Sequence, residues 1–291
     1  MDWITGIQKA IDYIEANLTE ELDYEKIAGC AYSSSFHFQR VFGILCGCTL
    51  GEYIRYRRLS LAGSELIASD ARIIDIALKY GYDSPESFGR AFTRFHGVTP
   101  SQAKKDGTSL KSFSRLSVKL KLEGGSIMNY KIEKKDAFEV VVKKRYYSTN
   151  MEISQKKIPS FWAESRQDGT IEEIIKFITK DNVFGPNIVG ICFENHTKND
   201  EFPYAIGAAY NGGDIPEGYS IETIPAHTWA IFECTGPMPE AYHQLIHRVY
   251  TEFFPASEYK PCGAYDIEVY PDGDIKSLDY KCEAWIAVEK K

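Results

Sequence analysis

An arginine recurs in this sequence at an offset of fifty residues, together with the residue types around it. Ser34, Phe38, Arg40, Phe42, Gly47 and Thr49 are repeated as Ser84, Phe88, Arg90, Phe92, Gly97 and Thr99. Arginine can donate two parallel hydrogen bonds to the edge of a guanine, and glutamine can bind adenine in the same bidentate way. The first copy also carries Gln39 directly before its arginine. The repeat therefore indicates two equivalent surfaces able to read base edges.

Each copy has the pattern of an amphipathic helix that follows a shorter helix. A serine stands at the N-cap position, and the apolar residues fall on one stripe. The side chains left outside this stripe are Phe36, Gln39, Arg40 and Gly43 in the first copy, and Glu86, Gly89, Arg90 and Thr93 in the second. A short helix, a turn and a second helix with a polar N-terminal face form a helix-turn-helix, whose second helix enters the major groove. For either copy alone, an ordinary helical bundle with a solvated arginine is the alternative.

The first hundred residues are helical in pattern throughout. Apolar periodicity and cap residues predict helices near 5–18, 23–30, 34–46, 50–68, 72–80, 84–96 and 100–105. The long helix between the two copies would hold them at a fixed separation. That spacing suits two successive major-groove segments, roughly 34 Å apart on one face of DNA.

The charge distribution divides the chain. The whole sequence carries −7, and residues 1–25 hold one basic against seven acidic side chains. Residues 26–107 carry +4, residues 108–127 carry +3 and residues 128–291 carry −8. A nucleic-acid-binding protein needs only one basic face. We therefore expect an all-α DNA-binding domain at 1–107, a flexible basic linker at 108–127 and a second domain at 128–291.

Several function classes find no support in the sequence. No apolar run is long enough for a membrane span, and the N-terminus lacks a signal-peptide pattern, so we expect a cytoplasmic protein without a membrane partner. Seven cysteines without a zinc-type spacing indicate reduced, buried thiols. His243 and His247 stand four residues apart but lack a third ligand, which favours a surface pair. We expect neither a metal nor a cofactor.

The C-terminal part has a doubled α+β pattern. The first half predicts a strand near 130–147, a helix near 155–166 and strands near 187–194 and 203–210; the second half predicts a strand near 218–235, a helix near 239–253 and strands near 262–270 and 280–289. Two such β-α-β-β units side by side would form a saddle with a concave sheet surface. Concave, aromatic-lined surfaces are typical sites for small ligands.

Two strings in the N-terminal part resemble the DNA-binding domain of AraC/XylS-family transcriptional regulators. They are YSSSFHFQRVFGILCGCTLGEYIRYRRLSLA and IIDIALKYGYDSPESFGRAFTRFHGVTPSQAKK, within a match over about residues 6–106. The resemblance implies DNA contacts from Ser34, Ser35, Phe36, Gln39, Arg40, Pro85, Glu86, Ser87 and Arg90. Pro85 and Glu86 depart from the residues that other members carry there. We therefore expect the second unit to read less sequence, with Arg90 supplying most of its affinity.

The strings AYDIEVYPDGD and YKCEAWIAVEKK, within about residues 129–290, resemble the GyrI-like effector-binding domains of Rob-like regulators. In that family a glutamate on the last strand reaches into the pocket, which here implies Glu283. Alternation places Trp285 on the same face of the strand. The ligand candidates are Glu283, Trp285, Tyr147, Trp162, Phe193, Trp229 and Tyr265. A carboxylate among aromatic rings suits a lipophilic cation.

Two alternatives remain for this half of the chain. Glu283 could be a solvated sheet residue and the aromatic residues could be core. Some GyrI-like domains hydrolyse reactive small molecules, which would give Glu283 a catalytic role together with Tyr147 or Trp162. Fusion to a DNA-binding module favours sensing. We therefore expect a non-enzymatic transcription regulator whose partners are double-stranded promoter DNA, a small hydrophobic or cationic effector and RNA polymerase.

Overall fold

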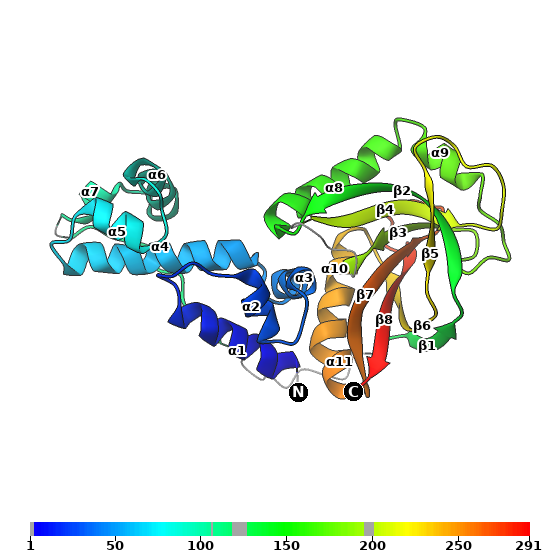
Figure 1. Ribbon diagram of the computed structural model, residues 1–291, viewed down its shortest axis with the longest axis horizontal. Coiled ribbons are helices and arrows are strands. Elements are labelled where there is room, and N and C mark those ends of the chain that lie inside the picture. Colours follow the sequence, from blue (N-terminus) through cyan, green and yellow to red (C-terminus); the bar gives the residue numbers. More distant parts are fainter. Residues whose placement is uncertain (1–2, 106, 118–126, 195–200) are drawn as a thin grey trace. The chain divides into compact units, whose positions relative to one another are not determined.

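The computed structural model describes residues 3–105, 107–117, 127–194 and 201–291 (Figure 1). The contacts divide the chain into two compact units. The N-terminal unit comprises residues 1–38 and 46–121, and the C-terminal unit comprises residues 39–45 and 122–291. The part of the expected linker at 118–126 lies outside the described residues.

Helices alone build the described part of the N-terminal region. They are α1 (Trp3–Ala16), α2 (Tyr24–Gly29), α3 (Ser35–Cys46), α4 (Leu50–Ala68), α5 (Ile73–Lys79), α6 (Pro85–His96) and α7 (Pro100–Ala103). Every helix that the apolar periodicity predicts is present, with ends that differ by a few residues. Around α4, α5 and α6 the core contains Leu59, Leu66, Ile76, Phe88 and Phe92.

The repeated glycine and threonine have a structural cause. Gly47 and Gly97 follow α3 and α6 with φ of 67° and 84°, a left-handed conformation that glycine adopts without steric cost. Thr49 and Thr99 then cap α4 and α7, each in a capping box that satisfies otherwise unpaired backbone N–H groups. Glycine and threonine therefore recur because each copy ends one helix and starts the next in the same way.

Residues 108–117 are bound to the N-terminal unit, which differs from the flexible linker expected there. The Phe113 N–H donates to Ser60 Oγ at 2.8 Å, and Arg57 donates to the Phe113 carbonyl at 2.6 Å. The Phe113 ring also contacts the ring of Tyr56, with centroids 5.3 Å apart. An aromatic residue in a Ser- and Lys-rich stretch gains free energy by packing, and here it holds the backbone along α4.

The C-terminal unit contains one eight-stranded, fully antiparallel sheet. Its strands are β1 (Tyr130–Lys135), β2 (Phe138–Ser148), β3 (Ile188–Cys192), β4 (Glu201–Ala209), β5 (Ser220–Ile224), β6 (His227–Thr235), β7 (Tyr259–Tyr270) and β8 (Lys281–Lys290). Their order across the sheet is β1-β6-β8-β7-β3-β4-β2-β5. The helical segments are α8 (Met151–Ser165), α9 (Thr170–Ile175), α10 (Glu240–Arg248), η2 (Val249–Phe253) and α11 (Phe254–Ala256).

The expected duplication is confirmed, with one addition. The series β2-α8-β3-β4 and β6-α10-β7-β8 are the two β-α-β-β units, and they meet where β3 pairs with β7. Each stretch expected as one long first strand is broken into two strands. The short first pieces are exchanged between the halves, because β1 pairs with β6 and β5 pairs with β2. The short helix α9 was not expected.

The two faces of the sheet have different neighbours. Helices α8 and α10 cover one face, which we call the helix face (Figure 1). The opposite face, which we call the inner face, carries a large apolar cluster. Alternation along β2 separates the two sides, since Val140 and Val142 belong to this cluster whereas Tyr147 contacts Phe161 of α8. The inner-face cluster also contains Phe193, Trp229, Tyr265 and Trp285.

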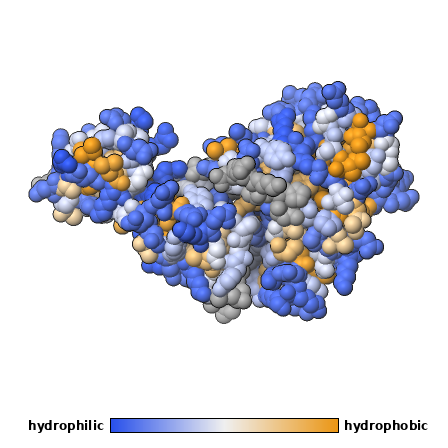
Figure 2. Space-filling model, in the orientation of Figure 1, coloured by the Kyte–Doolittle hydropathy of each residue, from blue (hydrophilic) through white to orange (hydrophobic). Residues whose placement is uncertain are grey.

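Hydrophilic side chains cover most of the surface seen in Figure 2, and hydrophobic ones form separate small patches. Within the described residues, no helix combines the length and apolar character needed to cross a membrane.

Candidate functional site

Helix α6 presents a charged outer face. Ser84 caps it by accepting a hydrogen bond from the Ser87 N–H at 3.1 Å, and Pro85 occupies the first helical position, where no N–H is needed. Glu86 and Arg90 are exposed. Among the described residues, Arg90 makes no hydrogen bond or ion pair. Its guanidinium is therefore available for a ligand outside the N-terminal unit.

Arg94 extends this face by one turn and was missed in the sequence analysis. It is exposed and lies four residues after Arg90, on the same side of α6. The four-residue spacing from Arg90 is the signal that could have found it. Comparison of the two copies hides this signal, because the first copy has Ile44 at the corresponding position.

Helix α3 differs from its copy in exposure. Phe36 and Gln39, expected on an exposed face, are only 2% and 3% exposed. Ser35 is also buried, and Arg40 keeps only 15% of its side-chain surface exposed and pairs with Asp266 and Glu194. A phenyl ring gains free energy on leaving water, which explains why Phe36 does not stay on a polar face. The assignment of these α3 residues to DNA contact stays a prediction.

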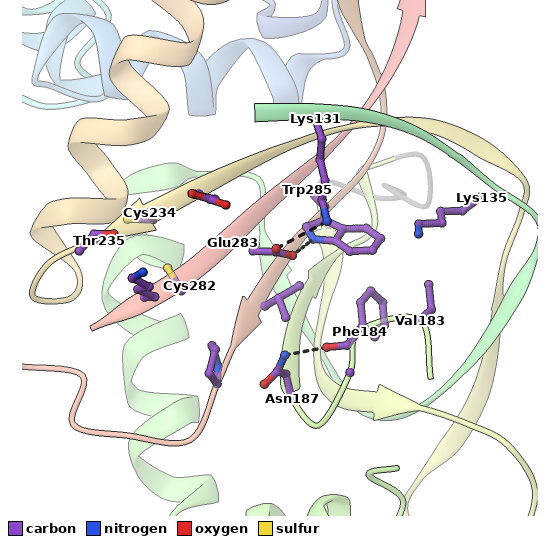
Figure 3. A pocket seen from close by; sticks show the side chains of 15 residues that line it. Lys131, Lys135, Val183, Phe184, Asn187, Cys234, Thr235, Cys282, Glu283 and Trp285 are labelled. Atoms are coloured by element: carbon purple, nitrogen blue, oxygen red, sulfur yellow. Dashed lines mark hydrogen bonds and ion pairs between the residues drawn. The ribbon is translucent and has the colours of Figure 1, made fainter. Parts of the chain in front are cut away.

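A pocket of about 370 Å³ opens at one end of the sheet, within the size range of small-molecule sites (Figure 3). Strands β1, β6, β7 and β8 and the segment before β3 contribute its lining. The lining residues are Lys131, Lys135, Val183, Phe184, Gly185, Asn187, Glu233, Cys234, Thr235, Val269, Pro271, Lys281, Cys282, Glu283 and Trp285. Two of the seven ligand candidates, Glu283 and Trp285, are therefore together in this pocket.

The Glu283 carboxylate is oriented by its neighbour on the same strand. Trp285 Nε1 donates a hydrogen bond to Glu283 Oε2 at 2.7 Å, and Figure 3 shows both side chains on one side of β8. The nearest cation is Lys131, whose Nζ lies 3.9 Å from Glu283 Oε1. The Glu283 side chain keeps 32% of its surface exposed. The carboxylate thus has a fixed direction, one firm hydrogen bond and room for another partner.

Two lysines and an aromatic ring complete the surroundings, and the sequence analysis named none of them. Lys135 Nζ lies 5.7 Å from the centroid of the Trp285 ring, and Glu133 pairs with both Lys135 and Lys131, at 2.5 and 3.3 Å. Phe184 packs edge-on against Trp285 with centroids 5.2 Å apart. Lys131 and Lys135 are four residues apart, so alternation places them on one face of β1, but this signal is usable only once the pairing of β1 with β6 is known.

Three further candidates belong to the inner-face cluster beside the pocket. Phe193 and Tyr265 pack against each other with centroids 5.8 Å apart, and Trp229 lies 5.9 Å from Trp285. All three are buried. The indole N–H of Trp229 and Nε2 of neighbouring His227 are buried without a hydrogen-bond partner among the described residues. Such atoms are rare in folded proteins, so they mark places where a ligand or water can bind.

His227 also has an altered titration. Its burial lowers the pKa of the imidazole, which disfavours the charged form. The ring therefore stays neutral at physiological pH and offers one donor and one acceptor nitrogen to the inner face.

Tyr147 and Trp162 do not join this site. Tyr147 lies on the helix face of β2, and Trp162 of α8 donates from its indole to Tyr204 at 2.9 Å. Tyr204 in turn donates to Glu268 at 3.0 Å. The expectation that Tyr147 and Trp162 share the pocket with Glu283 is wrong, because alternation along β2 and the packing of α8 place both side chains on the helix face. The hydrolase alternative required Tyr147 or Trp162 beside Glu283, and neither residue is there.

His243 and His247 are both exposed on α10. Within the described residues, no group of three or more His, Cys, Asp or Glu side chains could hold a metal ion.

These features define a class of protein. The N-terminal part of the chain carries two capped helix-turn-helix copies, and the C-terminal part is a duplicated sheet with an open, mixed aromatic and charged pocket. A chain of this kind combines DNA reading with the binding of a small molecule.

Comparison with known proteins assigns both parts. Residues 131–288 match the family described as integron-associated effector binding protein, and residues 27–106 match a helix-turn-helix domain family. The chain belongs to this effector-binding family, and its N-terminal part is that of the AraC/XylS-type transcription regulators. It is thus a regulator with a helix-turn-helix domain for DNA and a GyrI-like domain for an effector.

Curated relatives align with the N-terminal part. The transcriptional activator AarP of Providencia stuartii is 43% identical over 95 residues, which cover 33% of this chain and 70% of AarP. SoxS of Salmonella typhimurium is 40% identical over 33% of this chain and 89% of its own length. The regulator YbfP of Bacillus subtilis is 39% identical over 40% of each chain.

Among solved structures, SAV2435 bound to tetraphenylphosphonium is similar to the C-terminal part. The identity is 24%, the alignment covers 56% of this chain and 94% of that one, and the TM-score is 0.49.

Proposed function

We propose that the effector is an aromatic cation bound at the pocket by the Glu283 carboxylate. The observation that carries this proposal is the 2.7 Å hydrogen bond from Trp285, which orients the carboxylate while leaving it partly exposed. A cation there would face Glu283, and its rings would pack on Trp285 and Phe184. Aromatic faces attract cations through their quadrupole, which adds to the Coulomb attraction of the carboxylate.

A second candidate effector is an aromatic anion. The pocket lining contains three lysines against two glutamates, namely Lys131, Lys135, Lys281, Glu233 and Glu283. Glu133 already compensates Lys131 and Lys135, which lowers their attraction for a free anion. Glu283 lacks a comparably close ion pair, since Lys131 is 3.9 Å away. We therefore favour the cation.

On the DNA side, Arg90 and Arg40 are proposed to contact bases or phosphates in successive major-groove segments. The other proposed contacts are those implied by the family resemblance, from Ser34, Ser35, Phe36, Gln39, Pro85, Glu86 and Ser87. The exposed, unpaired Arg90 supports the second unit most directly. The domains that carry these roles are proposed at 1–107, with residues 108–117 bound to it, and at 128–291. As a promoter-bound regulator, the protein would act in the cytoplasm on RNA polymerase.

We propose that the pocket binds its effector without converting it. The two partners that the hydrolase alternative gives to Glu283, Tyr147 and Trp162, both lie on the helix face, away from its carboxylate. Binding alone is the chemistry that an oriented carboxylate next to aromatic rings supplies.

A reconstituted transcription assay tests this function. An operator is first selected from genomic fragments by the full-length protein, and transcription from it is measured with a rhodamine-type cationic dye and with an aromatic sulfonate of similar size. We expect the dye to change transcription for the parent and not for Glu283→Gln, with unchanged operator affinity in the absence of dye. A response to the sulfonate alone would support the anion, and chromatography showing Glu283-dependent loss of the dye would overturn a purely binding role.

A further inference from the structure

Beside the effector pocket lies a group of three sulfur atoms. Cys234 on β6 and Cys282 on β8 are direct partners in the strand register, and both are only 3% exposed. Their thiols are on the helix face, opposite to Glu233 and Glu283, which are the neighbouring register pair. Met238, in the turn between β6 and α10, places its Sδ 3.9 Å from Cys282 Sγ. Two thiols and a thioether therefore converge on one place under α10.

We propose that Cys234, Cys282 and Met238 form a binding site for a soft monovalent metal ion of the Cu(I) or Ag(I) type. Thiolate and thioether sulfurs are soft ligands and select soft ions. Three sulfurs in a plane around an ion at about 2.3 Å lie about 4.0 Å apart. The 3.9 Å between Cys282 Sγ and Met238 Sδ matches this spacing, and the Cys282 thiol also hydrogen-bonds to Cys234.

The donor set argues against zinc. A structural zinc site takes four nitrogen or sulfur ligands, and it uses cysteine and histidine rather than methionine. Among the described residues, no third His, Cys, Asp or Glu accompanies the two cysteines. A monovalent ion with three sulfurs needs no further ligand and brings less charge into a buried place.

The side chain of Cys282 donates a hydrogen bond to that of Cys234, which places the two thiols within reach of one ion. Coordination by both thiolates would release two protons per ion to solvent, so affinity should increase with pH.

The site is connected to the effector pocket through two adjacent strands. Cys234 and Cys282 line the pocket, as do their neighbours in sequence. Glu233 directly precedes Cys234 on β6, and Glu283 directly follows Cys282 on β8. An ion that bridges β6 and β8 would fix the spacing of these two strands next to Glu283. The proposal itself rests on the strand register and the sulfur positions, and it stands apart from the identity of the effector.

Anaerobic competition for Cu(I) tests the proposal on the full-length, reduced chain. Copper is supplied as its complex with bicinchoninate, and its transfer to the protein is followed by the loss of the chelator's colour. We expect the parent to take up one ion that Cys282→Ser binds more than about tenfold less tightly, a loss typical even of outer-shell partners. Met238→Leu keeps the volume and packing of the side chain but deletes the thioether, and we expect a smaller loss of about threefold or more.

The matched control is the double variant Cys46→Ser with Cys48→Ser, which removes the other closely spaced cysteine pair of the chain. It should bind copper as the parent does, and circular dichroism of each metal-free variant should match the parent. Unchanged affinity in Met238→Leu, or loss of binding in the control, would overturn the three-sulfur site. Failure of the reduced parent to take up copper would also overturn it. In that case, treatment with hydrogen peroxide would show whether the two thiols form a redox pair instead, since one peroxide oxidises both thiols to a Cys234–Cys282 disulfide and is reduced to two waters.

Discussion

Glu283 is the residue in which charge and shape can be separated experimentally. Its carboxylate has one firm hydrogen bond, from Trp285, and a single weak ion pair with Lys131 at 3.9 Å. Glu283→Gln keeps the size of the side chain and an oxygen that can accept from Trp285, but removes the negative charge. Any loss of affinity for a charged ligand therefore reports the Coulomb interaction and not a change in packing.

For a cationic rhodamine-type dye we expect Glu283→Gln to weaken binding by about 1–3 kcal/mol, the range for hydrogen bonds to charged groups. A neutral analogue of the same shape should lose much less. Isothermal titration of both ligands with both proteins gives the comparison as a double-mutant-type cycle. Equal losses for the two ligands would mean that Glu283 shapes the pocket without selecting charge.

Glu289→Gln is the matched control for this measurement. Glu289 lies on the same strand and, by alternation, on the same face, but it is more exposed and pairs with Lys260 at 2.9 Å. We expect no more than the small effect of an exposed ion pair, less than about 1 kcal/mol.

Arg90 offers the second test at this scale. It is exposed on α6 and unpaired within the described residues, so Arg90→Ala removes nothing from the fold. We expect operator binding to weaken by about 1–3 kcal/mol, with relaxed selectivity at one position if Arg90 contacts a base. If it contacts a phosphate, binding should weaken uniformly and the salt slope should fall by about 1.

Fluorescence anisotropy with the selected operator measures the Arg90 effect. Arg72→Ala serves as the control, because Arg72 is equally basic and exposed but is engaged with Asp75 at 2.7 Å. Parent-like affinity of Arg90→Ala for this operator would refute a DNA-reading role for the outer face of α6.

The family resemblance implied Glu283, and strand alternation, which is a local rule, placed Trp285 beside it. The sequence could not place Tyr147 or Trp162, since their side of the sheet depends on which face α8 covers. It also could not identify Lys131 and Lys135. These lysines reach the pocket only because β1 leaves its neighbour β2 and pairs with β6.

At the scale of elements, helices were predictable to within a few residues and strand partners were not. Caps and apolar stripes are encoded locally, which is why Gly97 and Thr99 indicate the end of α6 and the start of α7. Strand order depends on long-range pairing, and the exchange of β1 and β5 between the halves leaves no local signal. The binding of residues 108–117 along α4 was hidden for the same reason, since their composition is that of a linker.

His96 couples the end of α6 to this bound segment. Its Nδ1 accepts from the Lys111 N–H at 3.2 Å, so Nε2 carries the proton and donates to the Leu59 carbonyl at 3.0 Å. A neutral ring is required for both bonds. Burial lowers the pKa of His96, and the hydrogen bond to Leu59 opposes this shift only in part.

The lowered pKa of His96 gives a pH dependence with a defined sign. Below its ordinary value of about 6.5 the unfolded chain binds a proton that the folded chain resists. The free energy of unfolding of the N-terminal unit should therefore fall as pH decreases from about 6.5 toward the folded-state pKa. Urea titrations at several pH values, followed through the helical signal, measure this loss.

His96→Gln should reduce the slope in that pH range, because glutamine can donate and accept but does not titrate there. His243→Gln is the control, because it removes a histidine on α10 of the C-terminal part and leaves His96 in place. A slope that persists in His96→Gln would show that another group titrates.

At the scale of the whole molecule, each unit contains its own core, so each should fold without the other. The sheet of the C-terminal unit has its eight strands and covering helices within residues 130–290. A fragment of residues 128–291 should therefore unfold cooperatively and bind the cationic dye as the full chain does. Calorimetry and titration of the fragment test this, and an aggregated or molten fragment would contradict it.

The N-terminal unit extends beyond residue 107, into the segment expected as a linker. A division at residue 107 leaves out Phe113 and Leu110, which pack against the helical core, and the hydrogen bonds of Phe113 with Ser60 and Arg57. Partial burial of two large apolar side chains together with these bonds amounts to about 2–4 kcal/mol.

We therefore expect a fragment of residues 1–117 to be more stable than one of residues 1–107, with a melting temperature higher by about 10 °C for a unit of this size. The variant Phe113→Ala in the longer fragment should lower its melting temperature by most of this difference. Ser109→Ala, at an exposed position of the same segment, should lower it little. Thermal melts of the four proteins decide the matter. Equal melting temperatures for the two fragments would mean that residues 108–117 behave as the flexible linker that their composition predicts.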